Sequence, residues 1–169
     1  MNATGIKIAV VALIVVVLFL GFTASSLMRS KAFRADLTGR EEAPPANTNV
    51  RGMISFHVGP GDKEMTYLLS ITNIDGTTWI RIHEGEKGRE GPLVLDLSPN
   101  LRKGVELDEV ISEGTITADD LQGPLKGKPL DSLIQLMKAN NAYVNVGSLK
   151  HPRGEIRGQI RWMTWARRP

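Results

Sequence analysis

The segment 141–160, NAYVNVGSLKHPRGEIRGQI, constrains the fold most strongly, because two strand patterns follow each other in it with only a short link between them. In its first part, apolar residues alternate with Tyr143 and Asn145, a period of two that is typical of a half-buried β-strand. A turn-rich link ends in residues 151–154, and segment 155–162 then alternates again. Its apolar face holds Ile156, Gly158, Ile160 and Trp162, and its polar face holds Glu155, Arg157, Gln159 and Arg161. We therefore expect two adjacent strands, the second with a charged face toward solvent.

Further strand-like segments precede this pair, and each is bounded by residues that favour turns. They cover residues 32–37, 50–58, 65–74, 78–83, 93–97 and 110–116, with an interruption of the last at Gly114. One short helix is predicted after Pro129, because the apolar residues that follow recur at helical spacing. These residues are Leu130, Leu133, Ile134 and Met137. Many short strands with one short helical crossover predict a mainly β chain that forms an antiparallel, Greek-key-like β-sandwich or barrel.

Residues 8–28 form an apolar run without a charge, and Arg29 follows it. About 20 apolar residues suffice to cross a bilayer as a helix, and the length of this run favours a hydrophobic helix that anchors the chain. Alternatively, the run belongs to a signal peptide that is cleaved after Ser26, where small residues occupy the exit. Both interpretations place the rest of the chain outside the cytoplasm, either attached to the cell membrane by a single pass or secreted. The expected organisation is a targeting or anchor segment over 1–29, a β domain over 30–162 and a basic tail over 163–169.

The composition of the chain excludes some kinds of chemistry and some kinds of partner. The chain of 169 residues has no cysteine, which excludes disulfides and thiolate metal ligands. A net charge of +3 is small for this length, and acidic and basic residues are interspersed, which argues against nucleic acid as a partner. The exception is the end of the chain, where Arg161, Arg167 and Arg168 flank Trp162 and Trp165. That end is either a membrane-interface segment or a frayed basic strand end.

The final strand pair closely resembles the end of the CHRD domain, the module named after chordin, where a YVNV segment leads into HPxGEIRGQI. Other segments resemble the same family in chain order. They are FRADLTGREE at 33–42, MTYLL at 65–69, the block from 82 to 94, and residues 114–133. The resemblance spans about residues 33–162. It implies a β-rich module of a secreted or membrane-attached protein, with no generally assigned catalytic activity.

The same resemblance raises the question of a metal site. The family pattern has a His-x-His pair on one strand and a later histidine after the YVNV segment, but Arg81 and Gly147 occupy two of these positions here. Arginine stays protonated and cannot coordinate a metal. The candidate ligands that remain for copper or zinc are His83, His151 and the carboxylate of Glu84. We expect the chain to bind no metal and no other cofactor. The alternative is a metal site formed by these three residues.

Structural and binding roles are predicted for the charged residues. Glu155 and Arg157 are expected to pair with charges on neighbouring strands, Arg157 with Glu41 or Glu42. The glycine-punctuated loop 84–91, EGEKGREG, is a candidate contact surface, because exposed charged loops on rigid sheets are common binding surfaces.

These patterns favour a non-enzymatic binding or structural module outside the cytoplasm. Its partner is expected to be an unidentified protein, with membrane contact through residues 8–28. No catalytic residue is assigned, because no nucleophile is found with a base and an orienting acid. Two alternatives stay open: a metal-binding or redox-related protein that uses the remaining histidines, and an accessory subunit of a membrane protein complex.

Overall fold

The computed structural model of the chain describes residues 31–98 and 109–163. Within these two ranges, no helix is long and apolar enough to cross a membrane. The hydrophobic helix predicted over 8–28 and nearly all of the tail predicted over 163–169 lie outside the described residues.

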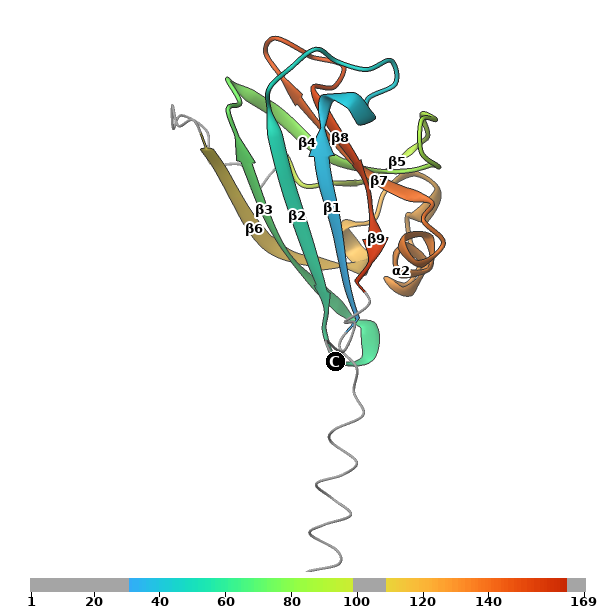
Figure 1. Cartoon of the computed structure of the whole chain (residues 1–169). Helices are drawn as coiled ribbons and strands as arrows, with labels where there is room; N and C mark the ends of the chain where they lie inside the picture. The colour runs from blue at the N-terminus through green and yellow to red at the C-terminus, as the bar shows by residue number, and fades with distance from the viewer. Residues whose placement is uncertain (1–30, 99–108, 164–169) are drawn as a thin grey trace, which may run out of the picture. The chain divides into compact units, whose positions relative to one another are not determined.

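In the described part, nine antiparallel strands form one sheet (Figure 1). The strands are β1 (Ala32–Thr38), β2 (Arg51–Val58), β3 (Glu64–Thr72), β4 (Thr77–Glu84), β5 (Leu93–Asp96), β6 (Glu109–Thr117), β7 (Ala142–Ser148), β8 (Ile156–Gln159) and β9 (Arg161–Trp162). Their order in the sheet is β5-β4-β7-β8-β1-β2-β3-β6, and β9 also pairs with β1. The first strand of the domain therefore lies between the last strands and the second, so that residues far apart in the sequence meet at the centre of the sheet.

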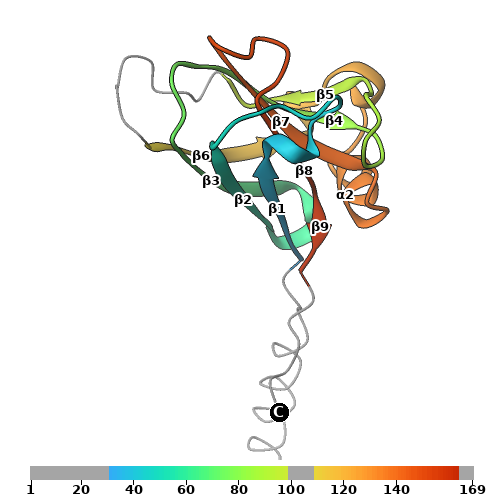
Figure 2. The same ribbon diagram turned by 45° about the horizontal axis from the view of Figure 1, so that its top comes forward.

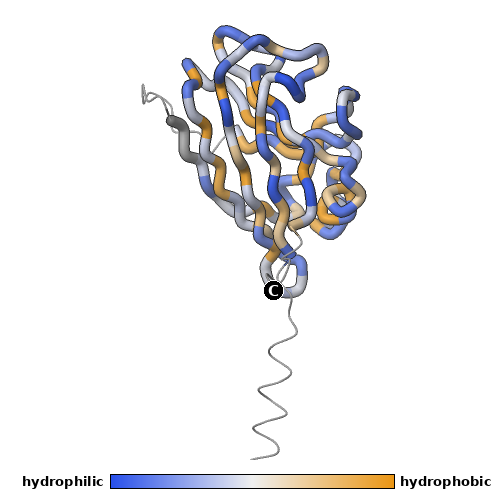
Figure 3. Tube along the Cα trace, viewed as in Figure 1, coloured by the Kyte–Doolittle hydropathy of each residue, from blue (hydrophilic) through white to orange (hydrophobic). Residues whose placement is uncertain are grey.

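The sheet curls into a half-barrel, which Figure 2 shows from nearer its upper end. Leu121, after β6, forms a bridge with Leu95 of β5, which links the segment after one edge strand to the other edge strand. Alternate residues along the strands point inward, and Figure 3 shows the resulting alternation of hydropathy along the chain. Fully buried side chains fill the inside, among them Phe33, Leu37, Ile54, Phe56, Leu69, Ile80 and Ile82. Each contributes roughly 1.5–3 kcal/mol through burial.

The predicted helix is α2 (Asp131–Lys138), which begins two residues after Pro129. Its buried side chains, Leu133, Ile134 and Met137, join the same hydrophobic core. Short 3-10 turns connect other elements: η1 (Gly39–Glu41), η2 (Pro60–Asp62), η4 (Ala118–Asp120) and η5 (Gly123–Leu125). The turn η1 lies close to the site described below.

The predicted fold class is confirmed: the described chain is mainly β, antiparallel and contains one α-helix. Two local predictions differ from the structure. Gly114 does not interrupt β6, because it pairs with Tyr67 and the ladder continues on both sides of it. The last strand is divided at Ile160, because β8 pairs mainly with β7 whereas β9 pairs with β1.

Candidate functional site

Polar side chains form a row across the outer face of the sheet, from β5 to β1. Strand pairing places them opposite one another in the order Asp96, Arg81, Asn145, Arg157 and Thr38. A neighbouring row contains His83, Tyr143 and Gln159. Side chains opposite each other on one face have Cβ atoms about 4.5–5.5 Å apart, so the two rows make one continuous polar surface. We call its part on and beside β7 and β8, namely Tyr143, Asn145, Glu155, Arg157 and Gln159, the covered polar face.

The prediction that the polar face of the last strand points toward solvent is wrong. Arg157 is 2% exposed, Glu155 4% and Gln159 9%, whereas Arg161 is exposed. The cause is tertiary, because two connections contact this face: the loop 84–91 and the segment 39–49 that begins with η1. Alternation along a strand shows which residues share a face, but it carries no information about what covers that face.

Arg157 lies at the centre of the covered polar face. Its Nη2 donates to the backbone carbonyl oxygens of Glu86, at 3.0 Å, and Arg89, at 2.8 Å. Its guanidinium carbon lies 3.4 Å from the centroid of the Tyr143 ring. Arginine suits this position because a planar guanidinium can stack on a ring while its N–H groups fork toward separate acceptors. The two hydrogen bonds tie the middle of loop 84–91 to β8, and we call them the Arg157 clamp.

Gln159 holds the start of the same loop. Its Nε2 lies 2.9 Å from the carbonyl oxygen of Gly85 and 2.7 Å and 3.0 Å from those of Asn140 and Ala142. The amide therefore joins the loop to the segment that enters β7.

Tyr143 and His83 hold the end of the loop. The Tyr143 hydroxyl accepts a hydrogen bond from the Gly91 N–H at 3.2 Å, and Nδ1 of His83 lies 2.9 Å from the Gly91 carbonyl oxygen. Because a carbonyl only accepts, Nδ1 of His83 carries the hydrogen. Burial lowers the pKa of His83 and raises the pKa of Tyr143, which favours the neutral form of each at neutral pH.

Glu42 faces the covered polar face from the end of η1. The amide Nδ2 of Asn145 donates to Oε2 of Glu42 at 3.4 Å. Burial raises the pKa of Glu42 to about 7, and the positive charge of Arg157 opposes this rise. Glu42 and Arg157, which were expected to pair, therefore interact electrostatically, while the hydrogen bonds of Arg157 described above go to the loop. The other candidate partner, Glu41, accepts a hydrogen bond from Lys87 Nζ at 2.8 Å.

Glu155 joins the second covering segment to the face. Its Oε1 accepts a hydrogen bond from the Thr48 hydroxyl at 2.7 Å and lies 4.0 Å from Nε2 of His151. Among the described residues, the contacts of Glu155 are therefore with a hydroxyl and an imidazole in the connecting segments, and not with charges on neighbouring strands.

The three candidate metal ligands are not brought together. His83 and Glu84 lie at the end of β4 that pairs with the start of β7. His151 follows Ser148, which pairs with Thr77 at the opposite end of β4. The strand between these ends spans roughly 20 Å at about 3.3 Å per residue. In residues 31–98 and 109–163, no group of three or more His, Cys, Asp and Glu side chains could hold a metal ion.

Arg81 and Gly147, which stand at two of the three histidine positions of the family pattern, belong to one packing arrangement around Trp79. A Cβ atom on Gly147 would lie 2.2 Å from Cε2 of Trp79, so only glycine leaves room for the indole. The indole N–H donates to the Pro152 carbonyl oxygen at 3.1 Å. The Arg81 guanidinium carbon lies 4.9 Å from the Trp79 ring centroid, and its Nε lies 3.5 Å from a carboxylate oxygen of Asp96.

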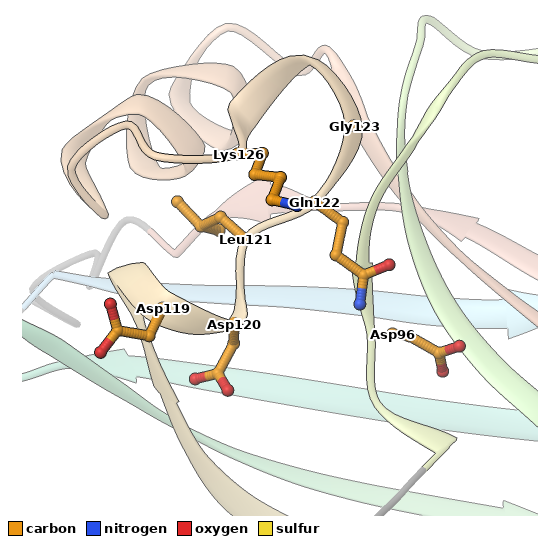
Figure 4. Close-up of a pocket in the computed structure, with 7 residues that line it drawn as sticks. All are labelled: Asp96, Asp119, Asp120, Leu121, Gln122, Gly123 and Lys126. Atoms are coloured by element: carbon orange, nitrogen blue, oxygen red, sulfur yellow. The ribbon is translucent and has the colours of Figure 1, made fainter.

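An open pocket of about 610 Å³ lies beside β5 (Figure 4). Asp96, Asp119, Asp120, Leu121, Gln122, Gly123 and Lys126 line it. Asp120 accepts a hydrogen bond from the Thr117 N–H at 2.7 Å, and Asp96 accepts one from the Ser98 N–H at 2.9 Å and faces Arg81. Asp120 thus stabilises the turn that follows β6, and Asp96 stabilises the turn at Ser98 and interacts with Arg81.

Sequence reasoning missed Tyr143 and Asn145 as members of the site. The signal that could have found them is their alternation with Val144 and Val146, which places both on the face that also carries Arg157 and Gln159.

The fold and the site together define a single β-rich module with a loop fixed over a buried polar layer. The family model of the CHRD domain matches residues 33–160, most of the chain, and the chain therefore belongs to the CHRD family. No curated protein and no solved structure matches it.

Proposed function

We propose that this chain is a non-enzymatic binding module that acts outside the cytoplasm and presents loop 84–91 to a protein partner. Membership of the CHRD family supports an extracytoplasmic binding or structural module in general terms. The observation that carries the finer proposal is that the covered polar face binds the backbone of the loop. Its side chains hold Gly85, Glu86, Arg89 and Gly91 through main-chain atoms.

The loop presents its own side chains outward. Residues 86–90 are exposed, and two acidic residues, Glu86 and Glu90, flank the basic residues Lys87 and Arg89. A loop already fixed in one conformation loses less entropy on binding than a mobile loop does. The mixed charges suit a protein surface of complementary charge pattern better than a polyanion.

Attachment to the membrane is part of the proposal. The apolar run 8–28 supports either a single-pass anchor or a cleaved signal, and both lead to a domain outside the cytoplasm. The role of accessory subunit in a membrane complex is compatible with this proposal, because such a subunit also needs a binding surface. The metal-binding alternative has less support, since its candidate ligands lie at opposite ends of β4.

Photo-crosslinking of the full chain in its native membrane tests the proposal. A photoreactive amino acid replaces Lys87 in the loop or, as the control, Glu113 on β6, and both positions are exposed. We expect one discrete protein adduct from position 87 and none of the same mass from position 113. Absence of an adduct at position 87, or the same adduct from both positions, would contradict a role of this loop in partner binding.

A further inference from the structure

Two acceptor oxygens face the same small space beside Gly154. Oε1 of Glu42 and Oδ1 of Asn145 are both buried and have no hydrogen-bond partner among the described residues. A Cβ atom built on Gly154 would lie 2.9 Å from the first oxygen and 2.8 Å from the second, and the φ of +144° at this residue also favours glycine. Two acceptors cannot bond each other unless one carries a hydrogen, and of these two groups only the carboxyl takes up a proton near neutral pH.

The groups that act on the charge of Glu42 come from β7, β8 and loop 84–91 and from the neighbouring backbone. Arg157 of β8 stabilises the anion, Glu90 of loop 84–91 destabilises it, and the Asn145 amide of β7 and the backbone at Ala43 bond it. Burial outweighs the favourable contacts, and the pKa of Glu42 rises to about 7.

We propose that a proton on Glu42 locks loop 84–91 in place, and that loss of this proton to solvent releases the loop. In the protonated state, Oε1–H of Glu42 donates to Oδ1 of Asn145 and satisfies both oxygens. The carboxyl group is then neutral, and Arg157 directs its N–H groups to the loop carbonyls. In the ionised state, the carboxylate attracts the Arg157 guanidinium away from those carbonyls and repels Glu90, which belongs to the loop.

This inference rests on the proposed role of the loop as the partner surface and gives that surface a regulator. Partner binding would be tighter below neutral pH than above it, because the loop must be ordered in order to bind. The switch itself is a property of the free chain and can be measured without a partner.

Hydrogen exchange of the full chain at pH 6 and pH 8, corrected for the intrinsic exchange rates, tests the inference. In the wild type, we expect amides of residues 85–91 to be at least threefold less protected at pH 8, with protection of β2 and β3 unchanged. Glu42→Gln imitates the protonated carboxyl and should give equal protection at both pH values. Glu113→Gln, on exposed β6, is the matched control and should behave as the wild type does.

Equal protection of the wild-type loop at both pH values would overturn the inference, as would a pH dependence that survives in Glu42→Gln. A direct measurement needs no variant: the side-chain carboxyl carbon of Glu42, followed by NMR, should titrate near pH 7, and a midpoint near the ordinary 4.5 would also overturn it. A different result would contradict the proposed function, independently of the pH switch. If the loop switches but position 87 gives no crosslinked partner, the switch stands and the binding role does not.

Discussion

A buried arginine destabilises a fold unless its N–H groups and its charge are compensated. For Arg157, the carbonyl oxygens of Glu86 and Arg89 and the ring of Tyr143 provide this compensation. These hydrogen-bond partners are backbone groups, so Arg157 is satisfied only when the loop has its observed course. The arginine and the loop therefore stabilise each other, which explains why a strand face with an exposed pattern is buried.

Glu42 should make stability depend on pH in an unusual direction for a carboxylate. The folded chain keeps the proton up to about pH 7, whereas the unfolded chain loses it near 4.5, so unfolding releases a proton between these values. The free energy of unfolding should therefore fall as pH rises from about 4.5 to about 7 and level off above that range. Glu42→Gln should remove this component. Urea denaturation of the wild type and Glu42→Gln at several pH values measures the difference. If the free energy of unfolding depended on pH in the same way in both proteins, the result would contradict a raised pKa of Glu42.

Gly147→His, which introduces the histidine of the family pattern, should destabilise the chain. Its Cβ would collide with the Trp79 indole, and overpacking of this kind costs about 1–3 kcal/mol. Trp79→Ala removes the obstacle. The free energy of unfolding that the double variant loses should therefore be smaller than the sum of the losses in the two single variants. Thermal unfolding of the three variants gives the coupling free energy. Strict additivity would show that Trp79 does not set the requirement for glycine.

At the level of elements, the sequence predicted the strands better than the site. Periods of two located β2, β3 and β4 because each strand has one face in the core and turn residues at its ends. The same rule placed Arg157 and Gln159 correctly on the face opposite Ile156, but it could not show that loop 84–91 covers that face. Glu42 was a candidate partner of Arg157 from its charge and its place in a segment that resembles the family, whereas its contact with Asn145 spans 103 residues of sequence and depends on the strand order.

The helix α2 offers a test of the core at the same scale. Leu133 of α2 is fully buried, whereas Gln135 on the same helix is exposed. Leu133→Ala should lower the free energy of unfolding by about 2–5 kcal/mol through lost contacts and a cavity. Gln135→Ala should change it by less than about 0.5 kcal/mol. Chemical denaturation compares the two, and equal effects would contradict the packing of α2 on the core.

On the scale of the whole domain, the two ends of the described chain lie side by side. The Met163 N–H donates to the Ala32 carbonyl oxygen at 2.9 Å, and β9 pairs with the start of β1. In Figure 1, these ends lie at the lower end of the half-barrel, whereas η1 lies toward its upper end. Loop 84–91 reaches η1 through the Lys87–Glu41 pair, so the proposed partner surface lies away from the chain ends.

The absence of cysteine makes the location of the domain easy to test. Lys150 lies in an exposed turn, and Lys150→Cys would be the sole thiol in the chain. A membrane-impermeant maleimide applied to intact cells should label this variant. Asn2→Cys, before the apolar run, should react only after permeabilisation if the segment is an anchor, and should be missing from the mature chain if it is cleaved. Labelling of Lys150→Cys only after permeabilisation would contradict an extracytoplasmic domain.

The central claim is that the Arg157 clamp fixes loop 84–91. Hydrogen exchange of Arg157→Lys tests it most directly, with Arg161→Lys as the control because Arg161, on the next strand β9, is exposed. Lysine keeps the charge but loses the forked donors and the stacking on Tyr143. Since hydrogen bonds to a charged group contribute about 1.5–3 kcal/mol each, the Gly85, Arg89 and Gly91 amides should exchange at least about tenfold faster in Arg157→Lys only. Unchanged exchange in Arg157→Lys, or equal acceleration in both variants, would contradict the claim.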